Sequence, residues 1–215
     1  MDNEETLGMA MGALTGEYLR TKVVPEVDAY RFAKYASWAG TTQATPADIV
    51  VGTTDVPGLI GTAEGAMGDA EVPEDGRILF VSWNTYEALK SKITRYIDNS
   101  VTDVRNVIEM YEQMRVIRVP KGRFNTGITL LDGTSSGETA GGFTVTAGSY
   151  PINFMIVHPS AVVQVVKHVV PRLFSPEVNQ QADAWKYDYR IYHDAFVEAN
   201  KVGGIYVHHA ATANT

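Results

Sequence analysis

Helical periodicity dominates the first 40 residues. A capping box at Asp2 and Glu5 precedes apolar positions at i, i+4, i+7 and i+11, which predicts a helix over about 3–20. The apolar row consists of Leu7, Met11, Leu14 and Tyr18. A second row of small residues at four-residue spacing consists of Gly8, Gly12 and Gly16. Such a row weakens an isolated helix but lets another backbone approach closely, either within the fold or between subunits.

Proline and glycine divide the chain that follows. Pro25 suits the first turn of a second helix, because its missing N–H costs nothing there, and Gly40 is expected to end that helix. Thr45 and Pro46 have the form of another helix start. The polar stretch 41–45 between the two helices is therefore the candidate domain boundary.

The middle of the chain has the pattern of a layered lobe. A helix is expected from Asp55, with Leu59, Ala63, Ala66 and Ala70 on one face, up to a turn at 72–76. Residues 77–83 form an apolar run typical of a buried strand, and Asn84 is expected to cap a covering helix. Further strands are predicted at 116–119, 127–131, 143–146 and 152–158. A strand followed by a covering helix indicates an α/β or α+β lobe.

The last third of the chain is predicted to be extended. A turn or short helix is expected at Pro159, extended chain from His168, and a last strand at 204–208. Tyr187, Tyr189 and Ile191 alternate with polar neighbours, which is the period of a half-buried strand. The glycine-rich segment 132–142 between two predicted strands is typical of a mobile surface loop.

Composition narrows the function classes. The 215 residues carry a formal net charge of −7, which offers no basic surface for neutralising many phosphates and makes nucleic-acid binding improbable. Apolar residues make up 45% and charged residues 20%, typical of a packed globular protein. No apolar run is long enough to span a membrane, the first residues lack a secretory signal, and the absence of cysteine excludes disulfides and thiolate sites.

A search for chemical motifs gives no positive case for catalysis. None of the five histidines (His158, His168, His193, His208, His209) has metal-ligand spacing, and no nucleophile elbow or phosphate-binding loop is present. Asp183, Asp188 and Asp194 could serve acid–base chemistry only if two of them converge. The aromatic residues Trp185, Tyr187, Tyr189, Tyr192 and Phe196 favour cross-strand packing over a ligand platform. The sequence predicts no catalytic residue, no cofactor and no metal.

The order of these segments resembles that of a known family. Residues 23–32, 77–91, 116–124, 152–159 and 179–207 look like the major capsid protein of tailed bacteriophages or prophages with the Hong Kong 97 fold. The resemblance covers nearly the whole chain. It consists of short sequence segments in a consistent order and includes no catalytic motif.

The resemblance implies an α+β subunit of an icosahedral shell that encloses DNA. Residues 1–44 and 169–215 would form a peripheral domain with a spine helix and a long sheet, and residues 45–168 an axial α/β lobe. The subunit would assemble with itself into pentamers and hexamers, with scaffolding, portal or decoration proteins as further partners, in a virion built in the bacterial cytoplasm. Relatives carry an N-terminal arm before the spine helix, so this chain is expected to be N-terminally truncated and to assemble less readily. The charged residues Glu26, Asp28, Arg31 and Lys34 are expected to set the register between subunits.

Three alternatives stay open at the level of sequence. An encapsulin-like nanocompartment would use the same fold to enclose a cargo enzyme. A small carboxylate-dependent hydrolase would need a cleft with two converging carboxylates and a raised pKa. A binding module would use the aromatic residues of the last sheet as its platform, and Tyr189→Ser would then remove a ligand contact without unfolding the protein.

Overall fold

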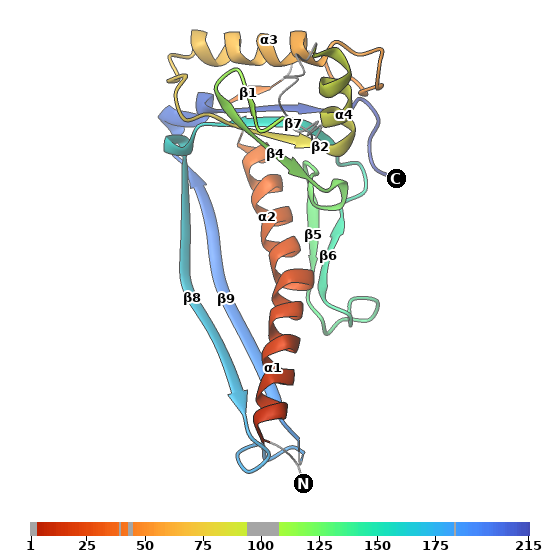
Figure 1. The fold of residues 1–215 in the computed structure, drawn as a ribbon, viewed down its shortest axis with the longest axis vertical. Coiled ribbons are helices and arrows are strands. Elements are labelled where there is room, and N and C mark those ends of the chain that lie inside the picture. Colours follow the sequence, from red (N-terminus) through yellow and green to blue (C-terminus); the bar gives the residue numbers. More distant parts are fainter. Residues whose placement is uncertain (1–3, 39, 43–44, 94–107, 183) are drawn as a thin grey trace, which may run out of the picture.

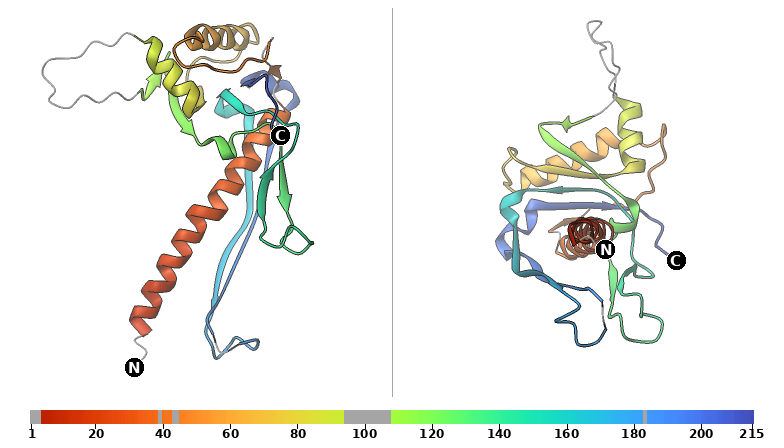
Figure 2. Two further views of the ribbon diagram at one scale, coloured as in Figure 1. Left: turned by 90° about the vertical axis from the view of Figure 1, so that its right-hand side faces the viewer. Right: turned by 60° about the horizontal axis from the view of Figure 1, so that its bottom comes forward.

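The chain forms a layered lobe from which one long helix and two hairpins extend (Figure 1). This computed structural model describes residues 4–215 except 39, 43–44, 94–107 and 183. Asp2 of the predicted capping box and Asp183, which both entered the sequence predictions, therefore lie outside the described residues. The helix and the hairpins project from the same side of the lobe (Figures 1 and 2).

The elements combine helices and strands in one α+β chain. The α-helices are α1 (Glu4–Tyr18), α2 (Val24–Ser37), α3 (Val56–Asp69) and α4 (Trp83–Lys92). The shorter helical turns are η1 (Leu19–Val23), η2 (Lys121–Arg123), η3 (Pro159–Ala161) and η4 (Ala199–Gly204). The strands are β1 (Thr41–Thr42), β2 (Ile78–Ser82), β3 (Met110–Tyr111), β4 (Met114–Val119), β5 (Ile128–Leu131), β6 (Gly142–Val145), β7 (Ile152–Val157), β8 (Val162–Phe174), β9 (Lys186–Val197) and β10 (Ile205–His209).

A six-stranded mixed sheet forms the middle layer of the lobe, in the order β1-β10-β7-β2-β4-β3. Strands β2 and β4 pair in parallel, whereas β7 runs antiparallel to both β2 and β10. All six residues of β7 are buried, because the strand is paired on both sides and covered on both faces. The sheet therefore has its most protected strand at its centre.

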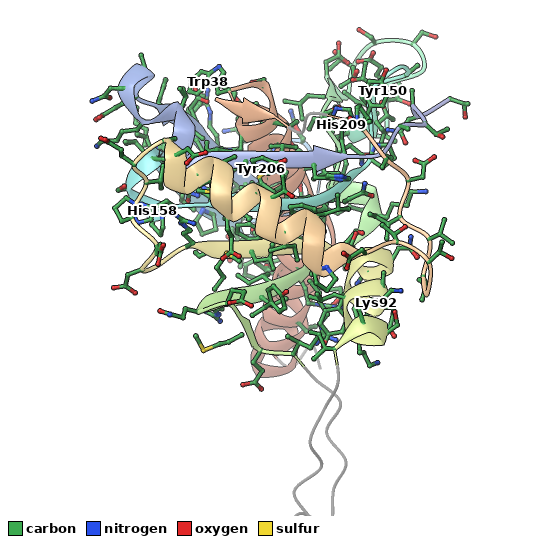
Figure 3. The ribbon with its side chains drawn as sticks, turned by 90° about the horizontal axis from the view of Figure 1, so that it is seen from above. Trp38, Lys92, Tyr150, His158, Tyr206 and His209 are labelled. Atoms are coloured by element: carbon green, nitrogen blue, oxygen red, sulfur yellow. The ribbon has the colours of Figure 1, made fainter. Side chains whose placement is uncertain are left out.

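The side chains of the sheet alternate between two apolar clusters. Leu79, Phe154 and Tyr206 belong to the cluster beneath α3 and α4, which lie over one face of the sheet (Figure 3). Met155 and Ile205 belong to the second cluster, where the end of α2 packs on the other face. Period-two alternation of apolar side chains thus supplies both interfaces of a three-layer lobe.

The first two predicted helices are one continuous helix. Between α1 and α2 the backbone widens into the π-helical turn η1, whose closing N–H of Val24 bonds to the Leu19 carbonyl. Pro25 follows at once, and a proline lacks the N–H and crowds the carbonyl four residues before it. The wider turn accommodates Pro25 inside a helix that the sequence led us to divide. The helix ends at Ser37, near Gly40, where a Cβ would lie 2.6 Å from the Val202 backbone carbon.

Most predicted elements are confirmed, with three corrections. The predicted helix start at Pro46 is wrong, because residues 46–50 have no regular structure and Ile49 instead enters the core. The cap of α4 is Ser82, whose hydroxyl oxygen accepts from the Thr85 N–H, and not Asn84. Strand β8 begins at Val162, six residues before the extended chain that we predicted from His168.

Candidate assembly surfaces

Strands β8 and β9 form a two-stranded ribbon beside the long helix (Figure 1). The ribbon pairs antiparallel from Val162 opposite Val197 to Phe174 opposite Lys186. On the face toward the helix, the rings of Tyr187 and Tyr189 meet the ring of Tyr18 edge-on, at centroid distances of 6.1 and 6.5 Å. The ribbon therefore packs against the helix through edge-to-face contacts of tyrosine rings.

Strand β8 has several large apolar side chains that are exposed to solvent. Their exposed fractions lie between 43% and 50%, for Val163, Val165, Val166, Val169 and Leu173. Within the described residues β8 pairs only with β9, so its other backbone edge is open. A two-stranded ribbon has little stability alone, and an open valine-rich edge favours pairing with another chain. This strand is a surface that a partner would cover.

The first half of the long helix is also uncovered. Leu14 is 60% exposed, and a Cβ added at Gly12 or Gly16 would meet no atom within 4 Å. Residues 6–16 contain no charged side chain. A helix that is apolar all round is normally buried, and an isolated helix of this length with several glycines is marginal in water. Among the described residues, no other part of the chain packs closely on Gly12 or Gly16, which favours the contact between subunits.

A polar junction holds the ribbon to α2. The Tyr30 hydroxyl donates to Asp194 Oδ1 at 2.9 Å, and the Tyr30 ring meets the His193 ring edge-on at 5.3 Å. The Ala195 N–H and then the Tyr30 hydroxyl stabilise the carboxylate and lower the pKa of Asp194. Burial, and then the nearby Arg31 guanidinium, lowers the pKa of His193.

We expect Tyr30→Phe to lower the free energy of unfolding by about 1 kcal/mol, because it removes one hydrogen bond and keeps the ring contact with His193. Urea unfolding followed by circular dichroism measures the change. Tyr192→Phe is the matched control, since Tyr192 is 48% exposed on β9 and its hydroxyl bonds only to the exposed Arg190 guanidinium among the described residues. Equal losses in both variants would show that the junction bond contributes nothing specific.

The charged residues predicted to set the register between subunits are engaged within the chain. Arg123 Nη1 lies 2.9 Å from Asp28 Oδ2, and the Lys34 ammonium lies 4.7 Å from the centroid of the Trp38 ring. Burial raises the pKa of Glu26. Of these residues, Asp28 attaches α2 to the lobe through Arg123, and Lys34 packs against the end of its own helix.

The aromatic residues of the last sheet do not form one platform. Tyr187 and Tyr189 face the helix, whereas Tyr192 is exposed and carries the Arg190 guanidinium 4.7 Å from its ring centroid. Phe196 lies 6.4 Å from the Trp38 ring at the end of α2. The packing interpretation therefore accounts for the described contacts of these residues.

The two described carboxylates proposed for a hydrolase, Asp188 and Asp194, do not converge. Asp188 lies 3.8 Å from Lys186, and Asp194 is held by Tyr30. Six residues of extended strand separate Asp188 from Asp194, which is roughly 20 Å and too far for a catalytic pair.

Among the residues that the structure describes, no three histidine or carboxylate side chains are arranged to hold a metal ion. In the same part of the chain, no helix combines the length and apolarity needed to cross a membrane.

A groove at the start of α4 was not predicted from the sequence. It encloses about 780 Å³ and has a mostly apolar lining that includes Trp83, Lys121 and Asn153. Trp83 is 51% exposed, and the Arg118 guanidinium lies 4.8 Å from its ring centroid. Arg118 meets Trp83 because β2 and β4 pair with Ser82 opposite Val119, a register that no local sequence signal encodes.

Comparison with known proteins shows which solved structures share this arrangement of helices and strands. No family model and no curated protein matches the chain by sequence. The capsid structure of the cyanophage P-SCSP1u aligns with 98% of this chain at a TM-score of 0.61 and 13% identity. A structure from Mycobacterium phage Che8 aligns with 86% of the chain at a TM-score of 0.54 and 15% identity. The chain has the fold of phage capsid proteins.

The capsid-like fold agrees with the α+β class predicted from the sequence and with the resemblance to phage capsids. The matched region makes up 67% of the cyanophage chain and 58% of the Che8 chain, so this chain spans only part of the length of both. At 13–15% identity the likeness concerns the path of the backbone. The uncovered helix and ribbon described above belong to this capsid-like fold.

Proposed function

We propose that this chain is a major capsid subunit of a phage or prophage, with no enzymatic activity. The observation that carries the proposal is the capsid fold together with large apolar surfaces that the isolated chain leaves uncovered, on α1 and on β8. Clustered exposed apolar side chains mark interaction sites, and a shell subunit covers such sites with neighbouring copies.

Within this proposal the fold is of the Hong Kong 97 type. The helix α1–α2 is the spine, the ribbon β8–β9 is the peripheral sheet, and the three-layer lobe is the axial domain. The proposed division is 1–44 and 169–215 against 45–168, with two refinements. Because β8 begins at Val162, residues 162–168 are better assigned to the peripheral sheet. Because β10 pairs with β7 in the central sheet, residues 205–209 are better assigned to the axial lobe.

The proposed assembly consists of pentamers and hexamers in an icosahedral shell around DNA, in a virion built in the host cytoplasm. Scaffolding, portal and decoration proteins are its further candidate partners. The net charge of −7 suits a container, because a wall that gripped DNA through many phosphates would hinder packing and ejection.

We expect the chain to form particles larger than a monomer at high protein concentration, seen by light scattering and as rings or shells in negative-stain micrographs. Val169→Asp should reduce this association, because it places a charge among the exposed apolar side chains of β8. Val51→Asp is the matched control, since Val51 is 47% exposed in the segment before α3. A compact monomer under all conditions would count against the proposed function.

A further inference from the structure

The two ends of the central sheet differ in charge. Strands β2 and β4 are parallel, so Ile78 lies at one end of the lobe and Ser82 at the other, roughly 15 Å apart. We call these ends the amino edge, around Arg77 and Glu112, and the carboxyl edge, around Trp83 and Lys121. Because they are opposite ends of one sheet, a single copy cannot bring them together.

The carboxyl edge is apolar and cationic. The groove beside Trp83 lies here, with Lys121 in its lining and Arg118 stacked over the exposed indole ring. The carboxylate in the lining, Asp48, is occupied within the chain. Its Oδ2 accepts from the Thr212 hydroxyl at 2.8 Å, and its Oδ1 accepts from two N–H groups of the C-terminal segment. The groove therefore offers the Trp83 ring and the Lys121 cation to an occupant, and Arg118 adds a second cation beside that ring.

The amino edge is acidic. A depression of about 460 Å³ is lined by one cation and four carboxylates: Arg77, Glu64, Asp69, Glu74 and Glu112. Arg77 is 3% exposed and directs Nε and Nη2 at the carbonyl oxygens of Pro73 and Val72, at 2.9 and 2.7 Å. Burial, and then repulsion from Glu112, raises the pKa of Glu64. A cation brought from outside would relieve this repulsion.

We propose that the amino edge of one copy docks into the carboxyl edge of the next, so that Arg118 and Lys121 face the Glu64–Glu112 cluster while the neighbour covers Trp83. The occupant of the groove is thus a second copy of this chain, and the inference rests on the proposed capsid function. The contact joins two different surfaces of the same subunit, and contacts of this kind close into rings when the rotation permits. A central tryptophan supplies affinity, and complementary charges set orientation and make association sensitive to salt.

Cross-linking tests the direction of the contact, because the chain has no cysteine of its own. Gly68→Cys places a thiol at the amino edge, where a Cβ meets nothing within 4 Å. Glu87→Cys places one on the exposed helix face that also carries Trp83. With a flexible bis-maleimide, the double variant should give a ladder of cross-linked trimers and larger oligomers on a denaturing gel. Each single variant can give dimers at most, because it carries one thiol. A double variant that stops at dimers would overturn the head-to-tail contact and leave the capsid proposal standing.

Charge exchange tests the chemistry of the contact. In the double-cysteine background, Arg118→Glu with Lys121→Glu makes both edges acidic, and Glu64→Lys with Glu112→Lys makes both basic. Each variant alone should give about tenfold fewer cross-linked oligomers larger than a dimer. An equimolar mixture of the two variants should restore the yield, because every contact then joins unlike charges. Thermal melting confirms that both variants are folded. A ladder unchanged by either pair would overturn the contact, and absence of both cross-links and particles would overturn the capsid function with it.

Discussion

Phe124→Ala should lower the free energy of unfolding by about 3–5 kcal/mol, the largest loss that we expect from a single substitution in this chain. Phe124 is fully buried, and its ring meets the Phe32 ring edge-on at a centroid distance of 4.9 Å. Phe32 in turn meets Phe80 on β2 at 5.2 Å. Truncating Phe124 therefore leaves a cavity where α2 attaches to the sheet, and it loosens the long helix together with the lobe.

Urea unfolding at neutral pH, followed by circular dichroism, measures this loss. Leu130→Ala is the matched control, because Leu130 is 49% exposed on β5 and its truncation opens no cavity. The control should change the free energy of unfolding by less than about 1 kcal/mol. Comparable losses in the two variants would contradict the assignment of Phe124 to the core.

Acid should destabilise the chain at a pH where carboxylates are still ionised, because His208 is buried in its neutral form. The ring is 2% exposed and stacks on Phe154, with Nδ1 3.1 Å from the Asn153 amide nitrogen. The Asn153 amide donates to Nδ1, which places the proton on Nε2, a buried atom without a partner among the described residues. Burial, and then repulsion from His209, lowers the pKa of His208 from 6.5 to about 4.

Between those two values the unfolded chain binds a proton that the folded chain does not bind. Stability is therefore unaffected by His208 above pH 6.5 and falls as the pH drops from 6.5 to about 4, by about 3 kcal/mol in total. His193, whose pKa is also lowered, acts in the same direction. The lowered pKa values of Asp48 and Asp194 act only below the ordinary carboxyl value of 3.8, outside this window.

His208→Asn tests the assignment, because asparagine keeps an acceptor for Asn153 and does not titrate. Unfolding free energies measured at pH 7, 6, 5 and 4.5 should decline less steeply in this variant than in the parent chain, whatever its stability at pH 7. His168→Asn on the ribbon should leave the slope unchanged. An unaltered slope in the His208 variant would show that another group causes the acid loss.

Local pattern predicted much of the fold because strand and helix periods depend on neighbouring residues. The alternation at Tyr187, Tyr189 and Ile191 identified β9, and Asp55–Pro57 marked the start of α3. The prediction at Pro46 was wrong because tertiary contacts determine that segment. The Ala47 carbonyl accepts from Asn153, and the Ile49 carbonyl accepts from Asn84, so the chain stays extended to reach both.

The candidate surfaces were harder to predict than the elements. The glycine row in α1 was visible in the sequence, but only the structure shows that a Cβ at Gly12 or Gly16 would contact no other described part of the chain. The groove at Trp83 depends on Arg118, which is 35 positions away and is brought close by the register of two parallel strands. Single-sequence reasoning has no access to such a register, since each residue taken alone is compatible with an ordinary surface position.

The two-sided central sheet also bears on how this architecture persists through divergence. A strand such as β7 needs apolar bulk at every position except Asn153. Many combinations of valine, isoleucine, leucine, methionine and phenylalanine provide it, and cores tolerate such exchanges if volume is kept. Two lineages can therefore replace nearly every core side chain while the backbone path survives. This tolerance is compatible with a shared fold at only 13% identity to the cyanophage capsid structure.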